Sequence, residues 1–84
     1  MIAVTKVKPL EDYKLLLQFN NSEQKIFDMS AHLDHGIFKE LKDKKIFNTV
    51  KIAFDSIEWV NGADLCPDLL YEKSNKLDET QLES

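Results

Sequence analysis

The segment Ser56–Tyr71, which reads SIEWVNGADLCPDLLY, constrains the fold more than any other part of the chain. Alternating apolar residues predict a strand over Ile57–Val60. Asn61-Gly62 is the strongest turn signal in the sequence, because both residues tolerate positive φ. A closing helix is predicted over Asp64–Lys73, with Pro67 in its first turn, where a missing N–H costs nothing. The chain should therefore end in a strand, a tight turn and a helix that folds back.

Ile57 and Trp59 lie two residues apart and should share one face of this strand. We expect the ring of Trp59 to pack between the sheet and the closing helix, with Leu69 and Leu70 beside it. Asp64 is a candidate cap for that helix. Trp59 and Tyr71 also have polar tips, and such aromatics are frequent at interfaces. An interface role for both residues therefore stays open beside the core role.

The first part of the chain predicts a three-stranded antiparallel meander. Its strands are rich in β-branched or alternating apolar residues and are separated by a break at Pro9 and by a turn at Asn20–Ser22. The expected strands are Ile2–Lys8, Tyr13–Phe19 and Glu23–Asp28.

The period changes in Ser30–Asp43, where apolar residues recur at helical spacing. The expected apolar stripe consists of Leu33, Ile37, Phe38 and Leu41, with Ser30 or Asp34 as a cap and Gly36 as a break. A further helical turn is predicted over Lys44–Phe47. Alternation then returns in Asn48–Phe54, with Val50, Ile52 and Phe54 on one face and a tight turn at Asp55-Ser56.

These elements predict an α+β fold, because strands and helices do not alternate strictly. The expected order is β-β-β-α-β-β-α around one antiparallel sheet. A chain of 84 residues forms a single domain. We expect this domain to span residues 1–74, and residues 75–84 to be a flexible polar tail.

Composition narrows the class of protein. The formal net charge is -4, whereas proteins that bind nucleic acids usually have a basic excess. Part of the acidity lies in the tail, at Asp78, Glu79 and Glu83, so a local basic patch stays open. Nucleic acid is therefore not the expected partner of the chain as a whole.

Cys66 is the single cysteine, so no internal disulfide forms, and a reducing compartment fits. The first residues contain no signal peptide, and no run approaches about 20 apolar residues. A cytoplasmic protein without a membrane span is the expectation.

Several short motifs occur in an order that resembles a known family. They are the proline after the first strand (Pro9), Phe27-Asp28, Leu41, Phe47, Trp59, Asn61-Gly62, Asp64-Leu65 and Leu70-Tyr71. In order and spacing they resemble the small bacterial proteins catalogued as domain of unknown function 2442. The chain departs from the pattern at Val60, where a proline is common. The resemblance implies a fold without an established activity. Relatives tend to be encoded beside other small proteins, which implies an antitoxin-like or regulatory role.

The residues that could bind a metal or take part in catalysis are better explained by structural roles. His32 and His35 have the spacing of metal ligands but lack a third ligand nearby, so an exposed polar turn is expected. Cys66 lacks an assignable base, so we expect a small buried apolar residue rather than a nucleophile. Asp28, Asp64 and Asp68 fit strand ends and caps better than an acid–base set. We therefore expect no catalytic residue, no metal, no cofactor and no enzyme activity.

The candidate contact residues are Trp59, Asp64, Tyr71, Lys39, Lys42, Lys44 and Lys45. The leading hypothesis is an interaction module that binds another protein or a second copy of itself, since strand edges and aromatics suit such contacts. The alternative is a regulator that binds nucleic acid through the basic cluster Lys39–Lys51. The absence of arginine weakens that alternative. An enzyme of unknown class is the third hypothesis.

Overall fold

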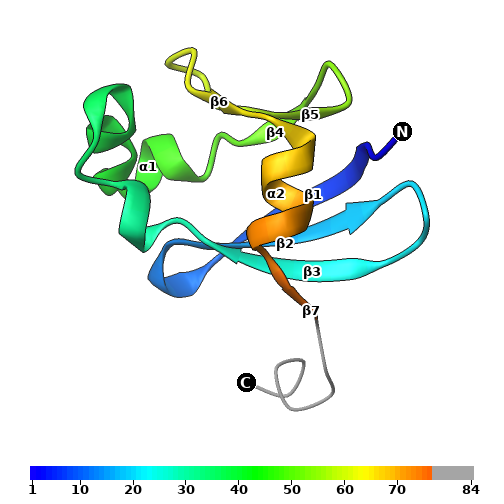
Figure 1. The fold of residues 1–84 in the computed structure, drawn as a ribbon. Helices are drawn as coiled ribbons and strands as arrows, with labels where there is room; N and C mark the ends of the chain where they lie inside the picture. The colour runs from blue at the N-terminus through cyan, green and yellow to red at the C-terminus, as the bar shows by residue number, and fades with distance from the viewer. Residues whose placement is uncertain (77–84) are drawn as a thin grey trace.

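The computed structural model describes residues 1–76 as an α+β domain (Figure 1). Its antiparallel strands divide between two sheets instead of forming the single expected sheet. The larger sheet has the order β1 (Val4–Leu10), β2 (Lys14–Phe19), β3 (Gln24–Asp28) and β7 (Asn75–Lys76). The smaller sheet has the order β4 (Lys51–Ala53), β5 (Ser56–Glu58) and β6 (Asp64–Leu65). The predicted α+β class is confirmed.

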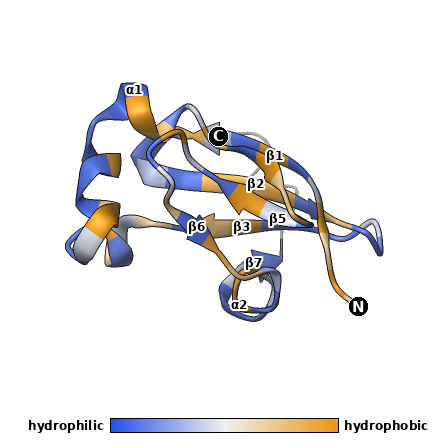
Figure 2. Ribbon diagram, turned by 90° about the horizontal axis from the view of Figure 1, so that it is seen from above, coloured by the Kyte–Doolittle hydropathy of each residue, from blue (hydrophilic) through white to orange (hydrophobic). Residues whose placement is uncertain are grey.

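Strands β1, β2 and β3 form the predicted meander, with Leu15 opposite both Pro9 and Phe27. The expected break at Pro9 is wrong, because β1 continues through Pro9 to Leu10. β1 is an edge strand of its sheet, where a residue without an N–H donor is tolerated. Burial alternates along β2, which places Leu15, Leu17 and Phe19 on the buried face. Figure 2 shows hydrophobic residues in this strand.

Short helical turns follow the meander: η2 (Ser30–His32), η3 (Gly36–Lys42) and α1 (Lys44–Phe47). The first two are 3-10 turns, which separate at Gly36, where φ is +52°. Neither Ser30 nor Asp34 is a helix cap as predicted, because Met29 and His35 occupy the N-cap positions of η2 and η3. Instead, the carboxylate of Asp43 accepts a hydrogen bond from the Lys45 N–H at the start of α1. Leu33 and Leu41 are buried as predicted, whereas Ile37 is exposed. A 3-10 turn has three residues per turn and does not maintain the expected stripe.

The Asn61-Gly62 turn forms as predicted. The Trp59 N–H donates to the Ala63 carbonyl at 2.8 Å, and Gly62 has a φ of +91°. This turn folds Asp64 and Leu65 back onto β5 as strand β6, with Asp64 opposite Glu58. Asp64 is therefore a strand residue and not the predicted helix cap.

The closing helix α2 (Pro67–Lys73) begins three residues later than predicted, with Cys66 at its N-cap position and Pro67 in its first turn. Figure 1 shows α2 against the larger sheet, on the side that faces the smaller sheet. Leu70 is fully buried, whereas Leu69 is half-buried.

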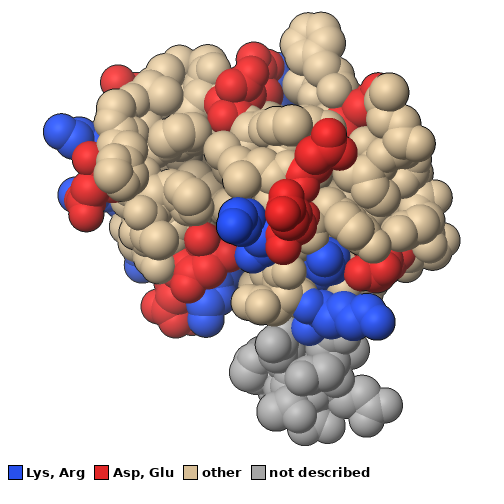
Figure 3. All heavy atoms as spheres, viewed as in Figure 1, with Lys and Arg blue, Asp and Glu red and all other residues tan. Residues whose placement is uncertain are grey.

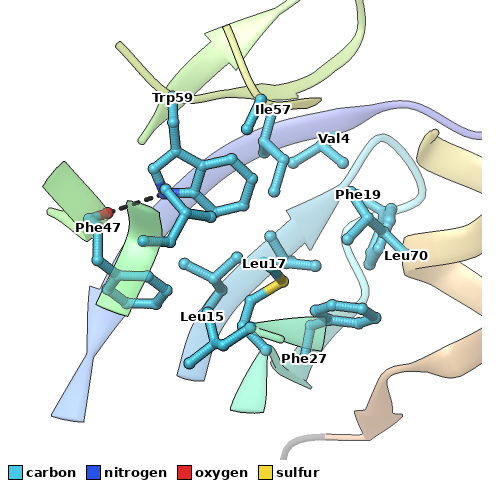
Figure 4. Close-up of a cluster of buried hydrophobic side chains, with 13 residues drawn as sticks. Val4, Leu15, Leu17, Phe19, Phe27, Phe47, Ile57, Trp59 and Leu70 are labelled. Carbon is cyan, nitrogen blue, oxygen red and sulfur yellow. Dashed lines mark hydrogen bonds between the residues drawn. The ribbon is translucent and has the colours of Figure 1, made fainter. Parts of the chain in front are cut away.

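The core lies between the two sheets, and Trp59 is its largest buried side chain (Figure 4). The predicted burial of Trp59 is confirmed, with 1% of the residue exposed. Its Nε1 donates a hydrogen bond to the Phe47 carbonyl at 2.9 Å, and the two ring centroids are 6.2 Å apart. α1 therefore holds the polar edge of the ring, and Leu70 of α2 joins the same buried cluster.

Asn75 and Lys76, which we assigned to the tail, form strand β7 and pair with Ile26 and Lys25 of β3. The ordered strand therefore extends two residues beyond the expected domain boundary. The rest of the predicted tail, residues 77–84, lies outside the described residues.

Candidate functional site

The hairpin between β4 and β5 has an unusual tip. Ala53 pairs with Ser56, which leaves a loop of two residues, Phe54 and Asp55. Both have positive φ, +54° and +65°, as two-residue turns of type I′ require. Asn and Gly are the usual residues in such turns, and a bulky residue there is strained. The tip therefore contains a phenylalanine where local backbone preference disfavours one.

The side chain of Phe54 is 93% exposed. The expectation that Phe54 shares one strand face with Val50 and Ile52 is wrong, because the turn lies one residue earlier than predicted and takes Phe54 out of the strand. Ile52 is 40% exposed and adds apolar surface on the same hairpin. An exposed aromatic on a strained turn does not contribute to the core, which makes this tip the first candidate for a contact site.

The tip is held in place by the larger sheet. The Val4 N–H of β1 donates a hydrogen bond to the Asp55 carbonyl at 2.8 Å. Val4 itself is buried. This bond fixes the turn against the body of the domain, so the backbone that carries the Phe54 ring has a defined orientation.

An open groove of about 350 Å³ lies beside the tip, between the hairpin and the start of α2. Its lining residues are Ala53, Phe54, Ser56, Ile57, Glu58, Asp64, Leu65, Cys66 and Pro67. The Ser56 hydroxyl donates to the Leu65 carbonyl and so links β5 to β6. The two charged residues of the lining, Glu58 and Asp64, are both carboxylates and lie opposite each other on neighbouring strands.

Cys66 lies at the rim of this groove and is exposed. The expectation of a buried cysteine is therefore wrong. The helix starts at Pro67, so Cys66 occupies the N-cap position, outside the apolar face of α2. No histidine is among the lining residues of the groove.

Of the aromatic candidates, Trp59 is enclosed in the core, and Tyr71 is half-buried against β3. The Tyr71 hydroxyl donates to a Glu23 carboxylate oxygen at 3.0 Å, and the Lys25 ammonium lies 4.0 Å from the ring centroid. The Tyr71 ring also packs edge-to-face on Phe19, with centroids 5.0 Å apart. Tyr71 therefore joins α2 to the larger sheet, and Asp64 alone of the non-lysine candidates lies beside Phe54.

The candidate lysines Lys39, Lys42, Lys44 and Lys45 are exposed on η3 and α1. Carboxylates are interspersed with them: Lys42 forms an ion pair with Asp34 at 2.8 Å, and Glu40 accepts a hydrogen bond from Asn61. The hydrogen bond and charge of Lys42 hold the pKa of Asp34 below its usual range. Figure 3 shows acidic and basic side chains mixed across the face in view.

The histidines do not come together with other ligands. The His32 ring stacks on Phe27 with centroids 5.5 Å apart, and His35 is exposed. Within residues 1–76, no three His, Cys, Asp or Glu side chains gather in a way that would hold a metal ion.

Asp28 accepts a hydrogen bond from the Ser30 N–H at 2.9 Å. Partial burial raises the pKa of Asp28, but the Ser30 hydrogen bonds and the charges of Lys14 and His32 lower it by more, to a value below 3.8. The charged form is therefore favoured in the folded state.

Replacement of Asp28 with Asn should lower stability at neutral pH, because the charged acceptor is lost. The folded-state pKa is depressed, so this contribution is present above pH 3.8 and is lost as pH falls through the folded-state pKa. The difference in unfolding free energy between wild type and Asp28→Asn should shrink in that window, as urea denaturation at stepped pH would measure. A difference that is constant down to acid pH would contradict this account.

A second hollow of about 540 Å³ opens near the β1–β2 connection, lined by Leu10, Glu11, Asp12, Lys14, Ile26, Asp28 and Asn75. Its lining mixes both signs of charge and contains no aromatic side chain. The groove beside Phe54 differs in having an exposed ring on its rim.

Sequence reasoning missed the Phe54 site, and turn preferences would not have found it. A type I′ turn requires positive φ at both of its residues, which a phenylalanine disfavours, so Asp55-Ser56 was a more natural choice than the observed Phe54-Asp55. The alternation of Val50, Ile52 and Phe54 favoured the wrong choice.

Comparison with known proteins gives one family. The sequence profile of the family described as "Protein of unknown function (DUF2442)" matches residues 4–76, and the chain belongs to this family. No curated protein and no solved structure matches the chain. Within residues 1–76, no helix has the length and apolar character needed to cross a membrane.

Proposed function

We propose that this protein is a non-enzymatic interaction module that binds another protein through the tip of the β4–β5 hairpin. The observation that carries the proposal is Phe54, which is 93% exposed on a turn where its backbone has a φ of +54°. The positive φ lowers the stability of the free domain, since a bulky residue in a left-handed turn is strained, and the exposed ring gains no burial energy to offset that strain. Burial of the ring against a partner would supply it.

The setting of Phe54 supports this role. Large aromatics at the centre of an interface are the usual hot spots of binding energy. The hydrogen bond from Val4 to Asp55 holds the turn before any partner arrives, which reduces the ordering entropy that binding must overcome. Ile52 extends the apolar surface along the same hairpin.

The finer role that we propose is antitoxin-like or regulatory, in the cytoplasm. The resemblance described in the sequence analysis implies such a role, and the lone cysteine suits a reducing compartment. In such a role, the module would act by occupying a surface of its partner rather than by chemistry of its own.

Co-purification from the native host would test the proposal. Tagged wild-type protein should retain a stoichiometric partner, and Phe54→Asn should lose it. Val60→Ser is a matched control, because Val60 is another exposed apolar residue, 71% exposed, beyond the opposite end of β5. Equal capture by wild type and Phe54→Asn, or no partner with either, would refute the proposal.

The same variant gives a prediction for stability. Phe54→Asn should raise the unfolding free energy by about 0.5–1 kcal/mol, because Asn adopts positive φ more readily than Phe. Urea denaturation would measure the change. A loss of more than about 1 kcal/mol would instead mean that the ring packs against the domain and is not presented to a partner.

A further inference from the structure

The groove beside Phe54 points to the chemistry of the partner. We propose that it takes a basic segment of another protein, in which an apolar side chain lies against Phe54 and is flanked by lysine or arginine. This inference rests on the proposed function and adds a class of partner to it.

The groove is large enough to hold an apolar side chain. The volume of about 350 Å³ lies near the lower end of the range of small-molecule sites, about 300–1,000 Å³. Phe54, Leu65 and Pro67 form walls from three different elements of the fold: the hairpin tip, β6 and the start of α2. An apolar side chain placed here would cover part of the exposed Phe54 ring.

The charged part of the site has a single sign. Glu58 and Asp64 are directly opposite in the β5–β6 register, and like charges in that arrangement destabilise a sheet. Neither carboxylate belongs to an ion pair among residues 1–76. Lys51 is the neighbour of Glu58 on its other side, in β4, and is not part of the groove lining. Two carboxylates of the groove are therefore available to cations from outside.

Two more carboxylates are next to groove residues in the sequence. Asp55 follows Phe54 in the turn and Asp68 follows Pro67 in α2; both are exposed, and neither lines the groove. A partner with Lys or Arg on each side of its apolar residue would relieve the repulsion between Glu58 and Asp64. Charge complementarity of this kind raises the association rate and excludes acidic competitors.

A second copy of this chain fits the groove less well. A symmetric contact through the hairpin tip would bring the acidic groove of one copy close to the acidic groove of the other, since both copies use the same patch. The net charge of -4 adds to that repulsion. Self-association is therefore an outcome of the test and not the proposal.

Selection from a random heptapeptide library on phage tests the inference with a defined probe. Immobilised wild-type protein should enrich peptides with an apolar residue flanked by Lys or Arg. The double variant Glu58→Lys, Asp64→Lys should lose these peptides. Phe54→Asn should lose them as well, because the apolar contact is absent.

Affinity measurements make the test quantitative. For a selected peptide with a fluorescent label, Glu58→Gln and Asp64→Asn should each weaken binding by about 1.5- to fivefold, the range of exposed ion pairs. Glu72→Gln is the matched control, an exposed carboxylate of α2 outside the groove, and should leave affinity unchanged. Higher salt should weaken binding by wild type more than by the two groove variants.

The outcomes separate this inference from the proposed function. Selection of acidic or uncharged peptides that still depend on Phe54 would overturn the basic-partner inference and leave the interaction role intact. Failure to enrich any peptide, or enrichment that survives both Phe54→Asn and the charge reversal, would overturn the inference. A concentration-dependent dimer abolished by Phe54→Asn would also overturn it, in favour of a second copy as the occupant.

Discussion

Replacement of Trp59 with Ala should cost about 3–5 kcal/mol of unfolding free energy, the range for removal of a large buried aromatic. Trp59 is 1% exposed and is the largest buried side chain of the described domain. A domain of this size has little stability to lose, since a single small core rarely supplies more than about 3–5 kcal/mol. The variant should therefore be largely unfolded at room temperature. Far-UV circular dichroism in a urea titration is the appropriate measurement, because the substitution removes the single tryptophan.

Trp59→Phe separates packing from hydrogen bonding. The Trp59 Nε1 donates to the Phe47 carbonyl at 2.9 Å, and this carbonyl is near the end of α1, where helical acceptors have no partner within the helix. Phenylalanine retains much of the apolar volume but leaves that acceptor unpaired, at a cost of about 1–3 kcal/mol. If Trp59→Ala lost only a few tenths of a kcal/mol, the assignment of Trp59 to the core would be wrong.

The parts of the fold that were predictable are those that local physics determines. Alternation in β2 placed Leu15, Leu17 and Phe19 on the buried face. Asn61-Gly62 identified a turn because few residue pairs accept its backbone angles. Pro67 identified the first turn of α2 for the same kind of reason.

The errors arose where tertiary context decides. Pro9 continues β1 because that strand is at the edge of its sheet, a position that the sequence does not record. Asp64 pairs with Glu58 because the turn before it directs the chain back onto β5. For Pro9 the outcome depends on the position of β1 in its sheet, and for Asp64 it depends on the hairpin that joins β5 to β6.

The candidate site was less predictable than the fold. Asp64 was identified from its motif, and it lies in the groove. Phe54 was placed on one strand face with Val50 and Ile52, because apolar residues in an alternating run normally share a face. Cys66 was expected to be a small buried residue because no base could be assigned to it, and it is exposed. An exposed apolar residue such as Phe54 can be recognised only when it is known which two residues form the turn.

Leu69 and Leu70 provide the second large effect. The sequence predicts that both face the sheet, but Leu70 is fully buried and Leu69 only half-buried. Leu70 is the one buried residue of α2. Leu70→Ala should therefore cost about 2–5 kcal/mol, and Leu69→Ala about 1 kcal/mol, because the loss scales with the buried volume that is removed.

The pair is a matched test, since both substitutions change Leu to Ala in adjacent positions of one helix and leave helix propensity equally affected. Urea denaturation followed by the fluorescence of the single buried tryptophan would report both variants, because Trp59 belongs to the same cluster as Leu70. A clearly larger loss of unfolding free energy in Leu70→Ala than in Leu69→Ala supports the observed orientation of α2. Equal losses would mean that the helix is rotated about its axis, so that it buries both leucines equally.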